Sequence, residues 1–229
     1  MRLDKFLSEA GVASRKELRS MIRSGRVAVD GQTVTEPEHR VDEMVQQVTV
    51  DGAGVRLPGS IVGMLHKPAG YVTSTDDPRD RTVMELLPPE YRSMGLKPVG
   101  RLDKDTEGLL LFTNDGALSH RLTSPRHQVE KVYYAETEGE TDDSDAAAFA
   151  VGLVLRDGAR CLPAELRPCP GGCHVVVREG KYHQVRRMLA ARGKPVTYLR
   201  REREGGVTLG TLEKGCFRLL TPEEMGKLL

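Results

Sequence analysis

Gly100-Arg-Leu-Asp-Lys-Asp-Thr-Glu-Gly-Leu-Leu-Leu-Phe-Thr-Asn-Asp-Gly116 is the stretch of sequence that decides the fold. A charged run at residues 101–105 leads into four apolar residues, Leu109 to Phe112. The apolar run predicts a short buried strand, and residues 114–116 predict the turn that ends it. Burying a charge is costly unless the charge is paired, so the charged run needs a partner. On composition alone, a local ion pair at the surface is a sufficient explanation.

The whole chain has 229 residues, 38% of them hydrophobic and 29% charged, which suits one large domain or two unequal ones. No apolar run approaches the ~20 residues that span a membrane. The N-terminus has no signal-peptide core, so we expect a cytoplasmic protein without membrane partners. Cys169 and Cys173 form the one close cysteine pair, with His174 beside it. A zinc site needs two such pairs or spaced histidines, so we expect no metal.

The formal net charge of +1 conceals two basic segments. Residues 1–26 carry seven Lys and Arg against three acids, and residues 178–203 carry nine against two. Two basic patches on a nearly neutral chain indicate two places that contact a polyanion. For one patch alone, a solvated helix face would be the simpler explanation.

The N-terminal part reads as a small module of two helices and a hairpin. Ser14 and Glu17 form a capping box that opens a helix to about Ser24, after a shorter helix over residues 3–10. Val27-Ala-Val-Asp-Gly31 predicts a tight hairpin, because Asp-Gly supplies the positive φ angles of such a turn. A further strand is expected at residues 48–50. Residues 52–60 are expected to form a linker.

These features resemble the small RNA-binding domain named for ribosomal protein S4. The resemblance rests on Arg2-Leu-Asp-Lys-Phe-Leu7, Ser14-Arg15, Ile22-Arg-Ser-Gly25 and the hairpin, and implies a domain over residues 1–58. In that family a basic helix grips folded RNA, mostly through phosphates. The RNA-binding residues that we expect are Arg2, Ser14, Arg15, Lys16, Arg19, Arg23 and Arg26.

The remaining part, residues 59–229, mixes strands and helices without a steady alternation. Strands are expected at 61–65, 109–112, 131–135, 174–178, 196–200 and 217–220. Helices are expected at 117–123, 144–151 and 180–192, with a short one capped by Thr221. This pattern favours an α+β fold, with a mostly antiparallel mixed sheet flanked by helices. The common nucleotide-binding, zinc-protease and serine-hydrolase signatures are absent from the sequence.

Three motifs, in order, resemble those of the RsuA/RluA superfamily of pseudouridine synthases. The first is the opening stretch, the second is Lys131-Val-Tyr133, and the third is Glu179-Gly-Lys-Tyr-His-Gln-Val-Arg-Arg-Met188. The resemblance implies that a uridine in RNA is isomerised to pseudouridine after its base leaves the stack. No redox change occurs and no group is lost, so no cofactor is expected.

Short segments narrow the branch to the RsuA type, whose wider group includes RluB, RluE and RluF. These segments are Lys67-Pro-Ala-Gly-Tyr-Val-Thr-Ser-Thr-Asp-Asp-Pro78, Ser124-Pro-Arg-His127 and Arg201-Glu-Arg-Glu-Gly-Gly206. The RsuA type implies a target in small-subunit (16S) ribosomal RNA. The expected partner is therefore 16S rRNA in a small-subunit assembly intermediate, bound by a monomer. A related enzyme acting on 23S rRNA is the alternative within the family.

The resemblance assigns the nucleophile to Asp103, because a carboxylate can attack or stabilise a sugar centre. It proposes Arg186 as the ion-pair partner that keeps Asp103 ionised. Tyr133 would stack on the uracil and place its hydroxyl for a proton transfer. The substrate-binding residues implied by the resemblance are Arg101, Val185, Lys131 and Arg187. Of these, Arg101 would fill the space left by the flipped base.

Three other readings stay open at this level. Asp105 is a rival to Asp103, although a turn or capping acid is its simpler role. A non-catalytic RNA-binding assembly factor would show the same basic patches. A glycosidase with a pair of carboxylates would need exposed aromatic residues, but only 4% of the chain is aromatic and it has no Trp. His183 is read as a structural or RNA-contacting residue.

Overall fold

The computed structural model describes residues 1–43, 45–57 and 59–228, and the chain divides into two compact units. The first unit combines Met1–Ile61 with Leu87–Lys97, and the second combines Val62–Leu86 with Pro98–Leu229. The domain boundary expected between residues 58 and 59 falls at Pro58, which lies outside the described residues. The contacts group the segment Leu87–Lys97 with the N-terminal unit, which no local sequence pattern indicates.

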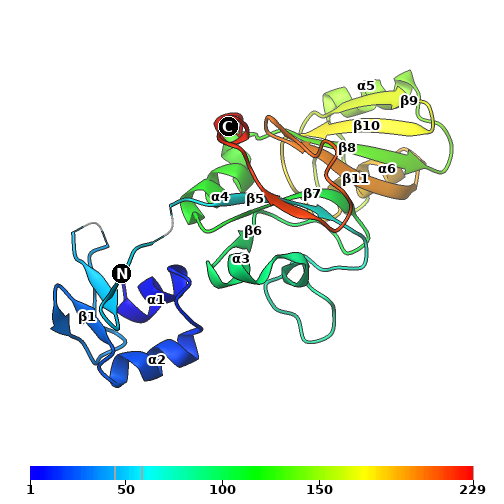
Figure 1. Cartoon of the computed structure of the whole chain (residues 1–229). Coiled ribbons are helices and arrows are strands. Elements are labelled where there is room, and N and C mark those ends of the chain that lie inside the picture. The colour runs from blue at the N-terminus through cyan, green and yellow to red at the C-terminus, as the bar shows by residue number, and fades with distance from the viewer. Residues whose placement is uncertain (44, 58, 229) are drawn as a thin grey trace. The chain divides into compact units, whose positions relative to one another are not determined.

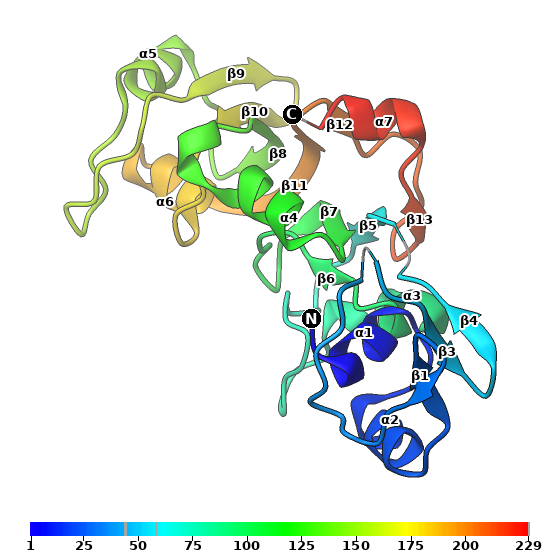
Figure 2. The same cartoon turned by 90° about the vertical axis from the view of Figure 1, so that its left-hand side faces the viewer.

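The first unit packs helices against a small sheet (Figures 1 and 2). Its helices are α1 (Leu3–Glu9), α2 (Arg15–Arg23) and α3 (Pro89–Ser93). Its sheet has the order β2-β1-β3-β4, formed by β1 (Val27–Val29), β2 (Gln32–Thr33), β3 (Val48–Val50) and β4 (Ala53–Val55). Apolar residues of α1, α2, β1 and β3 form one buried core, which leaves the basic side chains of α2 to solvent.

Local signals account for most of this unit. Ser14 caps α2: its Oγ accepts a hydrogen bond from Glu17 N at 3.4 Å, and Glu17 Oε2 accepts one from Ser14 N at 3.0 Å. Asp30 and Gly31 have φ angles of 50° and 80°, as the hairpin turn requires. The expected linker over residues 52–60 is wrong in its first part. Residues 53–55 form β4, because they pair with β3 across the Asp51-Gly52 turn.

The second unit is built on a sheet with the order β13-β5-β7-β11-β8-β10-β9. These strands are β5 (Val62–Lys67), β7 (Glu107–Thr113), β8 (Lys131–Thr137), β9 (Glu165–Cys169), β10 (Gly172–Val177), β11 (Val196–Glu204) and β13 (Phe217–Leu219). Two short strands, β6 (Lys97–Pro98) and β12 (Val207–Thr208), pair with β7 and β11. Along the main path only β7 and β11 run parallel, which confirms the mostly antiparallel mixed sheet.

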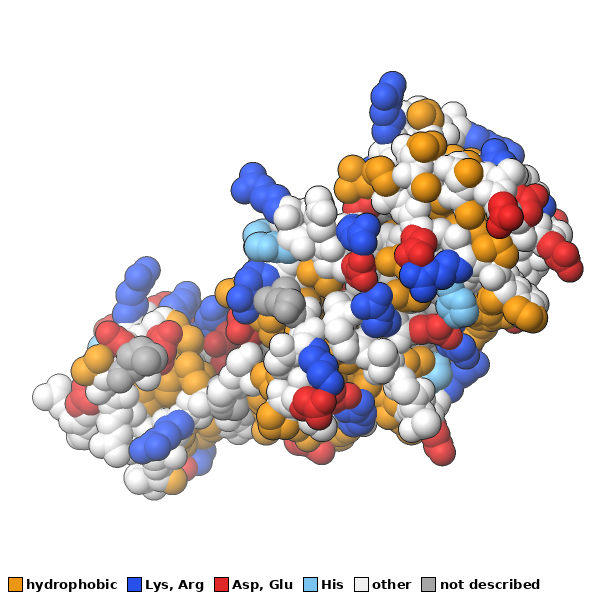
Figure 3. Space-filling view, turned by 90° about the horizontal axis from the view of Figure 1, so that it is seen from above, with side chains coloured by type: hydrophobic (Ala, Val, Ile, Leu, Met, Phe, Trp, Pro, Cys, Tyr) orange, Lys and Arg blue, Asp and Glu red, His pale blue; other side chains and the backbone are white. Residues whose placement is uncertain are grey.

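Helices α4 (Gly116–Thr123), α5 (Asp143–Val151) and α6 (Gln184–Ala191) flank this sheet, and α7 (Pro222–Gly226) lies near the C-terminus (Figure 1). Two 3₁₀ turns, η1 (Val83–Leu86) and η2 (Pro125–His127), lie in the connections. Helix α4 packs on β7, α5 on β9 and α6 on β11. On the face drawn in Figure 3, Lys and Arg lie among Asp and Glu, in keeping with the near-neutral net charge.

Strand β7 is the centre of this unit, as the opening stretch predicts, and all seven of its residues are buried. Leu109 and Leu111 belong to a core that also includes residues of β5 and α4. Gly108 has a φ of +106°, and a Cβ there would lie 2.2 Å from the carbonyl oxygen of Arg201. Glycine is therefore required for β7 and β11 to approach each other.

The third motif forms a loop before it forms a helix, so the expected helix start at Gly180 is wrong. Helix α6 begins at Gln184, after His183 in the left-handed conformation with φ of 48°. The Gln184 side chain stabilises the loop: its Oε1 accepts from Lys181 N at 2.9 Å and its Nε2 donates to Glu179 Oε1 at 2.8 Å. These bonds compete with an extra helical turn.

Within residues 1–43, 45–57 and 59–228, no helix is both long and apolar enough to cross a bilayer.

Candidate active site

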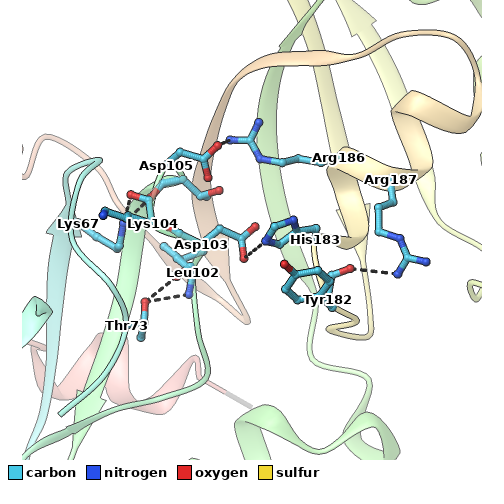
Figure 4. A network of polar contacts seen from close by, with 11 residues as sticks. Lys67, Thr73, Leu102, Asp103, Lys104, Asp105, Tyr182, His183, Arg186 and Arg187 are labelled. Carbon is cyan, nitrogen blue, oxygen red and sulfur yellow. Dashed lines mark hydrogen bonds and ion pairs between the residues drawn. The ribbon is translucent and has the colours of Figure 1, made fainter. Parts of the chain in front are cut away.

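The loop between β6 and β7 carries Asp103 and is held by the side chain of Lys67 (Figure 4). Lys67 ends β5 and its side chain has no exposed surface. Its ammonium group donates to the carbonyl oxygens of Pro68 (3.1 Å), Asp103 (3.0 Å), Lys104 (3.2 Å) and Thr106 (2.8 Å). One buried cation therefore fixes the backbone from Asp103 to Thr106.

A second anchor holds the residue before Asp103. Thr73 Oγ1 donates to Leu102 O at 2.7 Å, and Leu102 N donates to Thr73 Oγ1 at 3.1 Å. Both residues are buried, so this reciprocal pair is shielded from water. The Asp103 loop is thus fixed by interactions with the segment that follows β5 (Figure 4).

Burial lowers the pKa of Lys67 to about 8, and the carboxylates of Asp105, Asp103 and Glu107 oppose that shift. Desolvation disfavours the charged form of a lysine, and nearby acids favour it. We call these four hydrogen bonds from Lys67 to carbonyl oxygens the Lys67 clamp. The clamp is most complete below pH 8, where Lys67 carries three N–H donors.

Asp103 and Asp105 reach toward two different residues of the third motif. Asp103 Oδ1 lies 3.4 Å from Nε2 of His183, and Asp105 Oδ2 lies 2.8 Å from Nη2 of Arg186 (Figure 4). The prediction that Arg186 pairs with Asp103 is therefore wrong, because Arg186 pairs with Asp105. Residues two apart on the loop project differently, so the arginine meets the outer, 66% exposed carboxylate. His183 occupies the place next to Asp103.

Tyr133 lies on β8 and is buried. It stands opposite Arg201 of β11 and Val175 of β10, so their side chains share one face of the sheet. Burial raises the pKa of Tyr133, the guanidinium of Arg201 lowers it, and the carboxylates of Glu204 and Asp103 raise it further. Tyr133 is thus held as a neutral phenol.

A buried charge pair supports Tyr133 from β11. Arg201 and Glu204 are almost fully buried, and Arg201 Nη2 lies 3.1 Å from Glu204 Oε2. Arg201 Nε donates to Leu109 O at 2.7 Å, which ties the pair to the central strand. Lys131, which we expect to bind substrate, places its Nζ 3.8 Å from Glu204 Oε1 and donates to Val129 O. Lys131 is therefore the second cation beside Glu204.

The other residues of the predicted site are spread around this centre. Arg101 is exposed on the same loop, and Val185 is buried in the first turn of α6. Arg187 points away from Asp103: its Nη2 lies 2.5 Å from Asp157 Oδ2, and its Nη1 donates to Tyr182 O at 3.3 Å. Arg101 and Val185 stay available for their expected roles, whereas Arg187 is engaged by an acid.

On the first unit, four of the expected RNA-binding residues gather along α2. Arg15, Lys16, Arg19 and Arg23 line a surface hollow of about 780 Å³ together with Ser20 and Ser24. The other three have local partners. Arg2 binds Asp4 and Glu38, Ser14 caps the helix, and Arg26 holds Asp51 with Nη2–Oδ2 of 2.5 Å.

His, Cys, Asp and Glu do not gather in groups of three that could hold a metal ion anywhere in the described part of the chain. Cys161, Cys169, Cys173 and Cys216 are free thiols.

Comparison with known proteins decides the family. Residues 62–191 match the family model described as RNA pseudouridylate synthase, and residues 1–46 match the S4 domain. The chain belongs to the RNA pseudouridylate synthase family. It is therefore an RNA-modifying isomerase with an N-terminal S4 RNA-binding domain, and its resemblance to the RsuA type is confirmed over the whole chain.

Three similar proteins illustrate the match. The Ribosomal small subunit pseudouridine synthase A of Escherichia coli K12 is 42% identical, with 100% of both chains covered. The Uncharacterized RNA pseudouridine synthase YtzG of Bacillus subtilis is 41% identical over 98% of this chain and 97% of its own length. A solved pseudouridylate synthase superimposes with a TM-score of 0.71 at 34% identity, covering 100% of both chains.

Several residues that surround Asp103 and Tyr133 in this candidate site have no clear signal in the sequence. Lys67 appeared there only as part of a short branch-specific segment, and Arg201 only at the start of another. A lysine at the last position of an apolar strand is a signal for a buried cation that could have been used. The contact of His183 with Asp103 has no such signal, because it depends on the left-handed turn before α6.

Proposed function

We propose that this enzyme converts one uridine of small-subunit (16S) ribosomal RNA into pseudouridine, with Asp103 as the nucleophile. The observation that carries the proposal is the Asp103 carboxylate on a backbone fixed by Lys67, 3.4 Å from His183 at the start of α6. A reacting group held by buried hydrogen bonds is preorganised for attack. The printed name of the E. coli relative, a ribosomal small subunit enzyme, supports the choice of RNA.

The chemistry is an isomerisation in which the atoms balance within one nucleotide. The N1–C1′ bond of uridine breaks, the uracil turns, and C5 bonds to C1′. The proton on C5 leaves and N1 gains a proton, so neither an oxidant nor a leaving group is required. Asp103 would form a transient bond to the substrate or stabilise the positive charge at C1′. Asp103 must be ionised for either role.

Tyr133 and Arg186 would assist this step. Tyr133 is held as a phenol, so its hydroxyl can donate to or accept from the turning base. Arg186 is partly buried on α6 and pairs with Asp105, two residues after Asp103, where it can also contact the RNA backbone. Arg101, exposed two residues before Asp103, would fill the space that the flipped base leaves.

The basic hollow on α2 supports RNA as the substrate-bearing molecule. Four cations along one helix suit phosphate contacts, which position a protein without reading sequence. We propose that the S4 domain binds folded 16S rRNA in an assembling small subunit and that the enzyme acts as a monomer.

Pseudouridine mapping of rRNA tests this proposal. RNA from cells with the gene, without it, and complemented with either wild type or Asp103→Asn would be compared. We expect one 16S uridine to stay unmodified without the gene, and to be restored by wild type but not by Asp103→Asn. A lost site in 23S rRNA would contradict the target, and full restoration by Asp103→Asn would contradict the nucleophile.

A further inference from the structure

The loop before α6 presents a stacked aromatic pair next to Asp103. The rings of Tyr182 and His183 are nearly parallel, with centroids 3.8 Å apart and an angle of 17° between planes. Tyr182 is 75% exposed, although it is a large aromatic residue. His183 covers one face of the Tyr182 ring, and the exposed remainder faces solvent (Figure 4).

Several contacts fix this pair in place. His183 Nε2 lies 3.4 Å from Asp103 Oδ1, and its backbone adopts a φ of 48°, which non-glycine residues rarely take. Tyr182 O accepts a hydrogen bond from Nη1 of Arg187, whose Nη2 contacts Asp157 at 2.5 Å. A strained turn that holds an exposed aromatic ring beside a reacting group is typical of a functional constraint.

The Tyr182 ring offers a stacking surface to the RNA base next to a flipped uridine. When a base leaves the stack, its neighbour loses a stacking partner, and proteins commonly replace that partner with an aromatic side chain. An exposed phenol ring is suited to this because it adds a flat surface without a charge. The chain has only 4% aromatic residues and no Trp, so such a surface is scarce in this protein.

We propose that Tyr182 is the stacking platform for the RNA base adjacent to the flipped uridine. His183 stacks on the Tyr182 ring and contacts Asp103. A base stacked on Tyr182 would therefore lie at a fixed position relative to the reacting carboxylate. This inference rests on the proposed function, in which the target uridine is brought to Asp103. It assigns to Tyr182 the positioning of the substrate and leaves the bond-making steps to other residues.

An abasic scan tests the platform with a readout that a merely structural role would not move. The probe is the rRNA stem-loop around the uridine that wild type modifies, with single abasic nucleotides on either side. Binding is measured in the Asp103→Asn background, so that turnover does not enter. For the protein that retains Tyr182, we expect one flanking abasic site to weaken RNA binding roughly 5- to 150-fold, the range for one stacked base.

Substitutions of Tyr182 in the same binding experiment show whether Tyr182 is the stacking residue. Tyr182→Ala should weaken binding of intact RNA by the same factor and become insensitive to that abasic site, while Tyr182→Phe should behave like Tyr182. Tyr134→Ala is the matched control, because Tyr134 also lies beside a histidine but on the opposite face of β8 from Tyr133. The inference would be overturned if the abasic site weakened RNA binding by Tyr182→Ala as much as it weakens binding by the protein with Tyr182. It would also be overturned if Tyr182→Ala bound intact RNA as tightly as that protein.

A fluorescence measurement gives independent evidence, because the chain contains no Trp. Tyr182→Trp introduces a single indole that keeps a stacking surface. Intact stem-loop should quench its emission, the abasic stem-loop should not, and Tyr134→Trp should respond to neither. Equal quenching by both RNAs would overturn the inference. Activity in Asp103→Asn would instead overturn the proposed nucleophile, so the two failures are distinguishable.

Discussion

Arg186 and Asp105 form an ion pair, with Nη2 of the arginine 2.8 Å from Oδ2 of the acid. This leaves Asp103 beside His183, two loop residues away and facing a different part of the third motif. The two acids of the loop therefore have separate surroundings. One is an outer partner for an arginine, and the other lies beside His183 on a backbone that buried Lys67 holds.

The Arg186–Asp105 pair should contribute little to stability. Asp105 is 66% exposed, and ion pairs of that kind are worth about 0–1 kcal/mol. We predict that Asp105→Asn lowers the free energy of unfolding by less than about 1 kcal/mol and changes the rate of pseudouridine formation by less than about fivefold. Chemical denaturation and a single-turnover assay would check this. A hundredfold loss of rate would make Asp105 part of the chemistry.

The Lys67 clamp should make activity fall as pH rises. Burial lowers the pKa of Lys67 to about 8, so the amine loses its proton and one donor above that pH. We predict that kcat/KM declines through about pH 8 on the alkaline side, as the loop that carries Asp103 loosens. The measurement is a pH–rate profile from pH 6 to 10.

Lys67→Met is the companion variant for that profile. It removes the titrating group and the four hydrogen bonds to carbonyl oxygens, so we expect activity at least tenfold lower and no decline centred near pH 8. If the alkaline decline persists unchanged in Lys67→Met, another group is responsible and the clamp does not govern the loop.

The buried pair of Arg201 and Glu204 should be sensitive to loss of one partner. Glu204→Gln would leave the guanidinium buried with a neutral neighbour, and such losses cost about 3–5 kcal/mol. We expect a destabilisation of that size in urea denaturation. The double variant Arg201→Met/Glu204→Leu should recover part of it, because the guanidinium is then no longer buried alone, whereas Lys131 still lacks its neighbouring acid. A single variant as stable as wild type would show that water reaches the pair.

The hollow on α2 should set the affinity for RNA and its salt dependence. Reversing the charge of Arg15, Lys16 and Arg19 removes phosphate contacts, so rRNA should bind more weakly and log Kd should depend less steeply on log salt. Binding titrations at several salt concentrations would measure this, with circular dichroism as the control for folding. An unchanged slope would place RNA on another surface.

Local sequence signals predicted the parts of the fold that neighbouring residues determine. The capping box of Ser14 and Glu17 and the buried run Leu109–Phe112 are of this kind, because each depends on a few consecutive residues. The start of α6 was misplaced, since the Gln184 side chain bonds the preceding loop and prevents an extra turn.

The contacts within the candidate site could not be predicted from the sequence. The motif resemblance proposes Asp103, Tyr133 and Arg186 as site residues, but which acid Arg186 meets depends on how Lys67 orients a loop some forty residues away in sequence. Buried Lys67, Arg201 and Glu204 were not singled out as core residues. Charged residues are normally exposed, and their burial follows from strand pairing at a distance.

The central claim is that Asp103 performs the chemistry and its neighbour Asp105 does not. Single-turnover pseudouridine formation on the mapped rRNA stem-loop should be measured for wild type, Asp103→Asn and Asp105→Asn, with RNA affinity and thermal stability measured alongside. The account predicts no detectable pseudouridine with Asp103→Asn at unchanged affinity and stability, and near wild-type formation with Asp105→Asn. Pseudouridine formed by Asp103→Asn at the wild-type rate would contradict it.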